Sequence, residues 1–190
     1  VGTLGILDGD RLERSNLQRQ ILHATRDVGR RKTESAQRTL RELHPDIRLC
    51  CTPERLGEAS GCLLDGYDVV LDATDNYASK LLIAKLCHRR GVPYVHAGID
   101  RYAGQVMTVL PGRTACYGCL FPDPPEPDDA PPAGPFGAVP GVLGSLQALE
   151  ALKCILGIGT LLTDRLLTCD LFALRFREIP VRRDPTCAVC

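Results

Sequence analysis

The 190-residue chain has no tryptophan, and only 5% of its residues are aromatic. Its 23 basic residues are balanced by 23 acidic ones, so the formal net charge is zero. A neutral chain has no net attraction for the phosphate backbone of nucleic acid or for an anionic membrane. No uninterrupted apolar run approaches the roughly 18 residues of a membrane-spanning helix, and no signal peptide opens the chain. We therefore expect a cytoplasmic protein that binds neither nucleic acid nor membrane.

An initiator methionine is also missing, because the chain begins at Val1 and enters the apolar stretch TLGIL almost at once. We interpret the chain as N-terminally truncated, beginning inside a domain. A length of 190 residues suffices for one sizeable domain, and no internal repeat is evident. We therefore expect a single domain over residues 1–190.

Cysteine, in contrast, is abundant, with ten residues. A disulfide framework is the usual explanation in a secreted protein. Six cysteines lie in apolar or periodic stretches, where a free cysteine behaves as a small buried hydrophobe. These are Cys50, Cys51, Cys62, Cys87, Cys154 and Cys169. The other four form two Cys-x-x-Cys pairs, Cys116 with Cys119 and Cys187 with Cys190. This pairing favours metal ligation over disulfides.

Apolar runs and helical patterns alternate along the chain. Strands are predicted over residues 3–10, 47–52, 67–74, 93–99 and 105–110, and two more around a turn within 165–181. Helices are predicted over residues 32–43, 76–90 and 142–157. Alternating strands and helices followed by strand-rich sequence indicate an α/β domain with a mostly parallel sheet.

Two long segments have neither pattern. Residues 13–32 are polar with scattered apolar positions, and we expect irregular structure with short helical turns. The segment FPDPPEPDDAPPAGPFGAVPGV begins at residue 121 and is rich in proline and glycine. Because proline removes a backbone donor and fixes φ, we expect a proline-rich crossover loop over residues 121–141.

An acidic residue ends the first predicted strand. In doubly wound folds such an acid hydrogen-bonds a ribose hydroxyl, about 20 residues after a glycine-rich phosphate loop. Asp8, at the end of LGILD, has this placement, and the glycine-rich loop would then precede Val1. The alternative is an aspartate that only faces solvent at the strand end.

Further polar residues could complete a triphosphate site. The stretch SNLQRQ supplies Asn16 and Arg19, and Lys32 follows a glycine-containing turn. The stretch LDATDN places Asp72 and Asp75 where a strand runs into a helix. Cations neutralise phosphate charge, and a carboxylate holds magnesium through oxygen. The alternative is a solvated rim of charges with an aspartate that caps the helix near residue 76.

These motifs occur together in one known family. In chain order they are LDGDRLERSNLQRQILH, VGRRK, VVLDATDN, CYGC, GVLGSLQALEALK and DPTCAVC. The combination resembles the ThiF/MoeB/HesA adenylyltransferases, bacterial relatives of ubiquitin-activating enzymes. The resemblance runs the whole chain and lacks only the family's first strand, glycine-rich loop and N-terminal arginine-bearing segment. It implies a Rossmann-like, mostly parallel sheet with helices on both faces and antiparallel C-terminal strands.

The resemblance also implies an activity. Such enzymes use ATP and Mg²⁺ to activate a ubiquitin-like sulfur-carrier protein ending in Gly-Gly, as in molybdopterin or thiamine biosynthesis. The carrier carboxylate attacks the α-phosphate, pyrophosphate leaves, and an acyl-adenylate remains for sulfur transfer. By matching position, Asp8 would bind ribose and Asn16 the phosphates, with Arg19, Lys32 and Asp75 as catalytic residues and Asp75 holding magnesium. The family is usually homodimeric, with the GSLQALEALK helix near the interface.

Two departures from the family pattern refine this expectation. Lys80 stands where the family often has an arginine, and a lysine lacks the fork geometry of a guanidinium. Residues 121–142 contain no cysteine, and Phe136 or its neighbours stand where many members carry a cysteine that links covalently to the carrier. We therefore expect a reaction that stops at the acyl-adenylate.

Four thiolates with no open position describe a structural zinc site. The 67 residues between the pairs (120–186) exceed the gap of a compact zinc ribbon, so spacing alone does not show that the pairs meet. Redox activity is an alternative, yet neither pair is predicted to open a helix after a strand. Two unrelated pairs are the third possibility. The resemblance favours structural Zn²⁺ held by all four cysteines.

Two other classes of function stay open. One is a catalytically inactive module that binds nucleotide and carrier, which the substitution at Lys80 would suit. The other is a dinucleotide-dependent oxidoreductase, although no hydride-transfer partner is evident. The four histidines show no metal spacing with one another, and we interpret them as surface or core residues.

Overall fold

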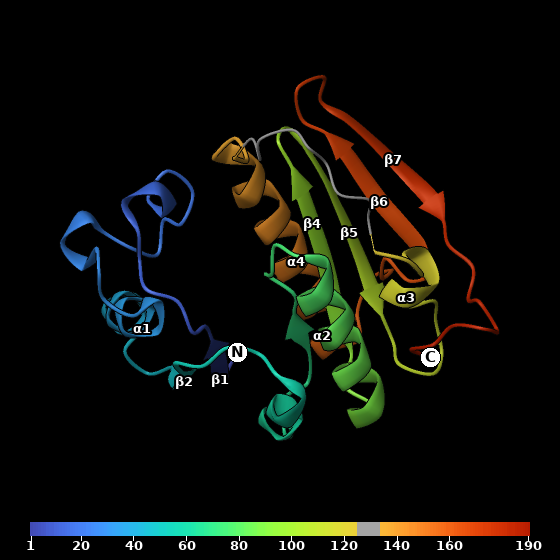
Figure 1. Ribbon diagram of the computed structural model, residues 1–190, viewed down its shortest axis with the longest axis horizontal. Helices are drawn as coiled ribbons and strands as arrows, with labels where there is room; N and C mark the ends of the chain where they lie inside the picture. The colour runs from blue at the N-terminus through green and yellow to red at the C-terminus, as the bar shows by residue number, and fades with distance from the viewer. Residues whose placement is uncertain (125–133) are drawn as a thin grey trace. The chain divides into compact units, whose positions relative to one another are not determined.

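The computed structural model describes residues 1–124 and 134–190 (Figure 1). The chain forms two compact units, residues 1–57 and 58–190. That both belong to one nucleotide-binding domain over residues 1–190 stays a prediction.

The first unit combines a parallel strand pair with one helix. Strand β1 (Thr3–Leu7) pairs with β2 (Arg48–Thr52), with Thr3 opposite Arg48 and Leu7 opposite Thr52. Helix α1 (Lys32–Leu43) has the predicted bounds and buries Thr33, Ser35 and Ala36. Leu43, in the last turn of the helix, is exposed.

Between β1 and α1 the chain makes two short 3-10 helices, η1 (Arg14–Asn16) and η2 (Thr25–Asp27). The predicted irregular segment with short helical turns is thereby confirmed.

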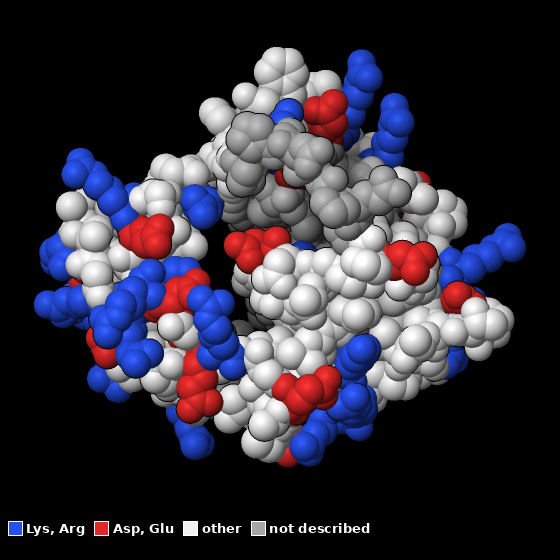
Figure 2. All heavy atoms as spheres, viewed as in Figure 1, with Lys and Arg blue, Asp and Glu red and all other residues white. Residues whose placement is uncertain are grey.

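On the face drawn in Figure 2, basic and acidic side chains of the first unit are intermingled.

The second unit is built on a five-stranded sheet in sequence order. Its strands are β3 (Val70–Leu71), β4 (Tyr94–Asp100), β5 (Ala103–Val109), β6 (Arg165–Asp170) and β7 (Arg175–Pro180). Strands β3 and β4 are parallel, and the later pairs are antiparallel. The antiparallel C-terminal strands are as predicted, but antiparallel pairing begins earlier, at β4 and β5. Only residues 101 and 102 join these strands, and so short a connection permits only an antiparallel pair.

Helices cover both faces of β4, as predicted. Val95 and Ala97 pack in the hydrophobic core with Val139 and Leu143 of helix α4 (Ala138–Leu156). Tyr94 alternates to the other face, where its hydroxyl accepts the N–H of Tyr117 at 3.0 Å, in the one-turn helix α3 (Tyr117–Leu120). Successive side chains of a strand point to opposite faces, so one strand serves both layers.

Helix α2 (Tyr77–Arg90) follows β3 directly. Its N-cap is Asn76, whose Oδ1 accepts the N–H of Ser79 at 2.9 Å, so the aspartate cap considered from the sequence is wrong. It ends at Gly91, whose φ of 67° is the left-handed conformation that glycine adopts without strain. The predicted helix over 76–90 is confirmed to within one residue.

Helix α4 begins earlier than the sequence suggested. Residues 138–141 belong to the helix rather than to the crossover loop, and Pro140 lies in its first turn. A proline is tolerated there because the first amides of a helix have no intrahelical acceptor. Residues 125–133 of the predicted loop lie outside the described residues.

By length and composition, α4 is the one helix within residues 1–124 and 134–190 that could cross a membrane, with a mean hydropathy of 1.3. It is nevertheless interrupted by Gln147, Glu150 and Lys153, and Glu150 forms an ion pair with Lys153. Its Val139 and Leu143 belong to the core of the second unit. In this structure α4 is a helix packed on the sheet.

Of the six cysteines expected to be buried hydrophobes, Cys87 and Cys169 are fully buried. Cys50, Cys51 and Cys154 are partly buried. Cys62 is exposed in the 3-10 segment η3 (Glu58–Leu64), so the prediction was wrong for that residue.

Candidate functional site

Asp8 and Lys32 lie together in the first unit. Asp8 follows the last residue of β1, and Lys32 is the first residue of α1. The Nζ of Lys32 lies 3.6 Å from Asp8 Oδ2, and the side chain of Lys32 is only 13% exposed. A carboxylate and a mostly buried ammonium group thus meet at the carboxyl end of a parallel strand. Open α/β sheets bind their ligands at this end of their strands.

Asp10 is a further member of this group that the sequence reasoning did not include. Its Oδ2 accepts from Lys32 Nζ at 3.1 Å, and its Oδ1 from Arg55 at 2.7 Å. The hydrogen bond from Lys32 holds the pKa of Asp10 below its ordinary value, against a smaller opposing effect of burial. The backbone N–H of Asp10 also donates to Asp8 Oδ1 at 2.8 Å, and this local turn after β1 holds the two aspartates together.

Asn16 and Arg19, the two residues of SNLQRQ predicted to belong to a triphosphate site, lie between β1 and α1. Asn16 is 9% exposed, and its Oδ1 accepts the N–H of Glu13 at 3.0 Å. Arg19, half-buried, donates from its guanidinium to the carbonyl oxygen of Ser15 at 3.2 Å. Asn16 therefore shapes the loop, and the phosphate contacts of both residues stay a prediction.

A buried carboxylate links the segment between β1 and α1 to helix α1. Asp27 is fully buried, and its Oδ2 accepts from the Arg38 guanidinium and from the N–H of Ala24. The hydrogen bond from Arg38 lowers the pKa of Asp27 to about 2, outweighing burial, with further help from Ser35 and Ala24. No periodic pattern in the sequence indicated this pair, because its partners are joined through the fold of the loop.

Asp75 belongs to the second unit, so the five predicted nucleotide residues divide between the two units. It lies in the turn between β3 and α2, is exposed, and receives a hydrogen bond at 3.3 Å from the side-chain amide of Asn76. An exposed carboxylate at a helix start offers the hard oxygen ligand that magnesium prefers.

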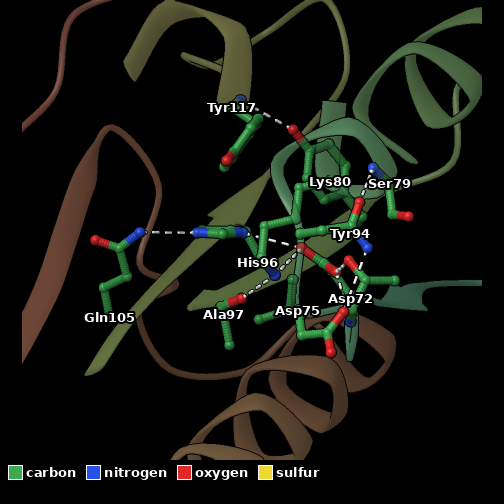
Figure 3. Close-up of polar contacts among 12 residues, drawn as sticks. Asp72, Asp75, Ser79, Lys80, Tyr94, His96, Ala97, Gln105 and Tyr117 are labelled. Carbon is green, nitrogen blue, oxygen red and sulfur yellow. Dashed lines mark hydrogen bonds and ion pairs between the residues drawn. The ribbon is translucent and has the colours of Figure 1, made fainter. Parts of the chain in front are cut away.

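Lys80 is a buried residue of helix α2 in this structure. It is 8% exposed, and its Nζ lies 3.1 Å from Asp72 Oδ2 and 2.6 Å from the carbonyl oxygen of Ala97 (Figure 3). His96 is fully buried, with Nδ1 3.0 Å from the same carboxylate oxygen. Burial would raise the pKa of Asp72, but His96, Lys80 and Thr74 together hold it below its ordinary value. Burial lowers the pKa of His96, despite the neighbouring carboxylate.

The two Cys-x-x-Cys pairs meet in the second unit. Cys116 Sγ lies 3.6 Å from Cys187 Sγ, and Cys119 Sγ lies 3.4 Å from Cys190 Sγ. All four sulfur atoms fall within 4.8 Å of one another. Zn–S bonds of about 2.3 Å in a tetrahedron imply sulfur separations of about 3.8 Å. The four thiols therefore fit a zinc ion, and the possibility of two unrelated pairs is excluded.

The backbone around this cluster is suited to thiolates. The N–H of Asp184 points to Cys119 Sγ and the N–H of Val189 to Cys187 Sγ, both at 3.4 Å. Burial would raise the pKa of Cys119, but the N–H of Asp184 and other donors around the sulfur hold it below its ordinary value. Such donors to the sulfur are a common outer support of metal-binding thiolates.

The glycine of CYGC, Gly118, lies where there is no room for a side chain. A Cβ at this position would lie 2.6 Å from Val189 Cγ2 and 3.1 Å from Cys187 Sγ. The bare backbone therefore allows the C-terminal segment to reach the first pair. Cys116 is the N-cap of the four-residue helix α3, and residues 110–115 separate it from strand β5.

The sequence matches one protein family over nearly its whole length. The model of the ThiF family matches residues 1–189. The SAMP-activating enzyme E1 of Haloferax volcanii is 41% identical over 194 residues, covering 100% of this chain and 72% of the relative. The sulfur carrier protein adenylyltransferase of Thermus thermophilus is 43% identical over 199 residues, covering 100% of this chain and 73% of the relative.

Solved structures give the same fold. The structure of Escherichia coli MccB with ATP matches with a TM-score of 0.86 at 24% identity. The match covers 100% of this chain but only 59% of MccB. At this identity the likeness shows the fold alone, and it confirms the Rossmann-like α/β class expected from the sequence.

Proposed function

The chain belongs to the ThiF family, and from this membership we infer that its full-length protein is an ATP-dependent adenylyltransferase. Its substrate would be the C-terminal Gly-Gly carboxylate of a ubiquitin-like sulfur-carrier protein. The names of the Haloferax and Thermus relatives support this substrate class. The structural observation that carries the proposal is the pairing of Lys32 with Asp8 at the carboxyl end of β1.

In the proposed reaction the carrier carboxylate attacks the α-phosphate of ATP, the bond from that phosphorus to the bridging oxygen breaks, and pyrophosphate leaves. The product is an acyl-adenylate. The attacking carboxylate is already ionised at neutral pH, so no general base is needed. Catalysis would then rest on positioning and on stabilising the negative charge of the phosphates.

Each predicted residue has a role in this scheme. Asp8 would accept hydrogen bonds from the ribose hydroxyls, and Lys32, Arg19 and Asn16 would contact the phosphates. Asp75 would hold Mg²⁺, whose charge offsets that of the phosphates when it is bound. Lys32 would exchange its contacts with Asp8 and Asp10 for contacts with phosphate oxygens.

The four clustered cysteines would hold a structural zinc ion, since four thiolates leave no open position for catalysis. Residues 121–142 contain no cysteine, which favours a reaction that ends at the acyl-adenylate. We further propose a cytoplasmic homodimer that does not bind nucleic acid or membrane. The zero net charge supports the last two points.

ATP–pyrophosphate exchange by the full-length, zinc-loaded protein tests this proposal, with and without carriers that end in Gly-Gly. We expect exchange that requires a carrier and disappears in the Asp75→Ala variant. Carrier binding without exchange, across several carriers, would contradict the enzyme assignment and indicate an inactive interaction module.

A further inference from the structure

We propose that Asp72 is a positioning residue, and that the buried cluster of Asp72, Lys80 and His96 fixes the turn that presents Asp75 to its metal ion. The inference rests on the proposed function, since it assigns Asp75 as a metal ligand. These residues lie in the second unit: Asp72 and Asp75 follow β3 in the segment before α2, Lys80 is on α2, and His96 is on β4 (Figure 3). We call these three residues the Asp72 cluster.

Both carboxylate oxygens of Asp72 are occupied by internal donors. Oδ1 accepts from the Thr74 N–H at 3.0 Å and from the Thr74 hydroxyl at 2.6 Å. Oδ2 accepts from Lys80 Nζ at 3.1 Å and from His96 Nδ1 at 3.0 Å. With four donors and an exposed fraction of 1%, Asp72 has no oxygen left for a metal ion. Of the two aspartates in LDATDN, only Asp75 is placed at the surface.

Asp75 lies between two fixed points of the backbone. On its N-terminal side, Thr74 is held by Asp72 through both its amide and its hydroxyl. On its C-terminal side, Asn76 caps α2 through the N–H of Ser79. The direction of the Asp75 carboxylate therefore follows from where Asp72 holds Thr74, leaving mainly its own side-chain torsions free.

The charges of the Asp72 cluster balance. Because Asp72 Oδ2 is an ionised acceptor, His96 must donate from Nδ1, and its Nε2 is then free to accept from the side-chain amide of Gln105 at 3.2 Å. His96 is thereby a neutral imidazole, and the single carboxylate faces the single ammonium of Lys80. A buried ion pair is tolerated when further hydrogen bonds satisfy its polar atoms. Here both oxygens of Asp72 accept hydrogen bonds, and Lys80 Nζ also donates to the carbonyl oxygen of Ala97.

A second contact holds the backbone of Asp72 itself. The side-chain amide of Gln147, on α4, donates to the carbonyl oxygens of Asp72 at 2.9 Å and of Val95 at 3.0 Å. The end of β3 is thus fixed to β4 from the α4 side, while Lys80 and His96 hold the side chain from the other side. Such a network of internal hydrogen bonds indicates a rigid support for the neighbouring turn.

The substitution Asp72→Asn tests the proposal in the full-length protein. It keeps the shape of the side chain but removes the charge and one acceptor oxygen. In nucleotide-free protein we expect amide hydrogen exchange in residues 73–77 to accelerate about 10-fold or more. We also expect the Mg²⁺ concentration for half-maximal pyrophosphate exchange to rise about 10- to 100-fold, as for other residues that support a metal ligand.

Glu150→Gln is the matched control. Glu150 is likewise a buried carboxylate of the second unit, 3% exposed, and it accepts from Thr108 Oγ1 and from the N–H of Leu162. This substitution should lower the stability of the protein without changing either readout. If Asp72→Asn alters both readouts no more than Glu150→Gln does, the positioning role is overturned.

A second variant keeps the proposal testable if the Asp72→Asn protein does not fold. His96→Gln removes the imidazole donor and leaves the Asp72–Lys80 pair, so several-fold faster exchange in residues 73–77 supports the proposal and unchanged exchange contradicts it. Pyrophosphate exchange that persists in Asp75→Ala would instead refute the metal-binding assignment of Asp75. The hydrogen-exchange result in nucleotide-free protein does not depend on that assignment, so the two failures are distinguishable.

Discussion

At the scale of single residues, Lys32 is the cation whose loss should cost most activity. Its ammonium is anchored at the start of α1 beside Asp8 and is only 13% exposed. We expect Lys32→Met to reduce kcat for pyrophosphate exchange about 100-fold or more, because removing one well-placed donor to developing charge costs that much in other enzymes. Steady-state kinetics with varied ATP measures the effect.

Lys85→Met is the control for this substitution, since Lys85 lies on α2 and is not among the predicted site residues. It should retain exchange near the wild-type rate. Equal activity of the two variants would show that Lys32 does not contact the reacting phosphates.

Asp27 should make the protein sensitive to acid. Its pKa falls from the ordinary 3.8 to about 2 in the folded state. The stabilisation is therefore complete above about pH 4 and is lost as the pH falls through about 2. At pH 7 we expect Asp27→Asn to lower the free energy of unfolding by about 2 kcal/mol.

Urea unfolding at several pH values measures this effect. The difference between wild type and Asp27→Asn should shrink between pH 4 and pH 2, where Asp27 takes up its proton. A difference that stays constant over this range would show that the ion pair with Arg38 does not supply the stabilisation.

At the scale of elements, the four-residue helix α3 meets the C-terminal segment so closely that only glycine fits at position 118. We expect Gly118→Ala to cost about 1–3 kcal/mol of stability through overpacking, and to speed the release of the proposed zinc ion to a chelator. A colorimetric zinc assay after chelator addition follows the release. Gly141→Ala is the control, since a Cβ there meets nothing within 4 Å, and it should release zinc at the wild-type rate.

Helix α2 depends on its N-cap. Asn76→Ala should lower the free energy of unfolding by about 1 kcal/mol, because the N–H of Ser79 loses its acceptor. Asn76→Asp keeps an acceptor oxygen and should be nearly neutral. Urea unfolding of the three proteins distinguishes them, and equal stability of the alanine and aspartate variants would contradict a capping role.

At the scale of the whole molecule, α4 leaves an apolar stripe uncovered. Val142, Leu149, Leu152 and Leu156 are 38–62% exposed at helical spacing. If the full-length protein is a homodimer, this stripe is where we expect the subunits to pack, since exposed apolar area of this kind marks interaction sites. Leu149→Glu combined with Leu152→Glu should then give a monomer in light scattering coupled to size-exclusion chromatography.

The control for the stripe is Leu174→Glu, which introduces the same charge at an exposed leucine in the turn between β6 and β7. It should leave the oligomeric state unchanged. A dimer that survives both charges on α4 would place the interface elsewhere.

Local features of the sequence determined most of the elements. The spacing of apolar side chains and the position of glycine act within a few residues. They indicated the bounds of α1, the end of α2 at Gly91, and the strands β4 and β5. Strand β1 ends at Leu7 and not at the predicted residue 10, so Asp8 follows the strand directly. The apolar pattern was less informative for β3, which has two residues where residues 67–74 were predicted to form a strand. A strand ends where its neighbour stops pairing with it.

Only the tertiary structure decided which side chains face one another. Sequence spacing could not join Cys116 to Cys187, bury Lys80, or separate Asp72, saturated by internal donors, from the exposed Asp75. Nor could it pair Asp27 with Arg38. A period states which face of an element is apolar, whereas an ion pair or a metal site depends on partners from other elements, brought close by packing.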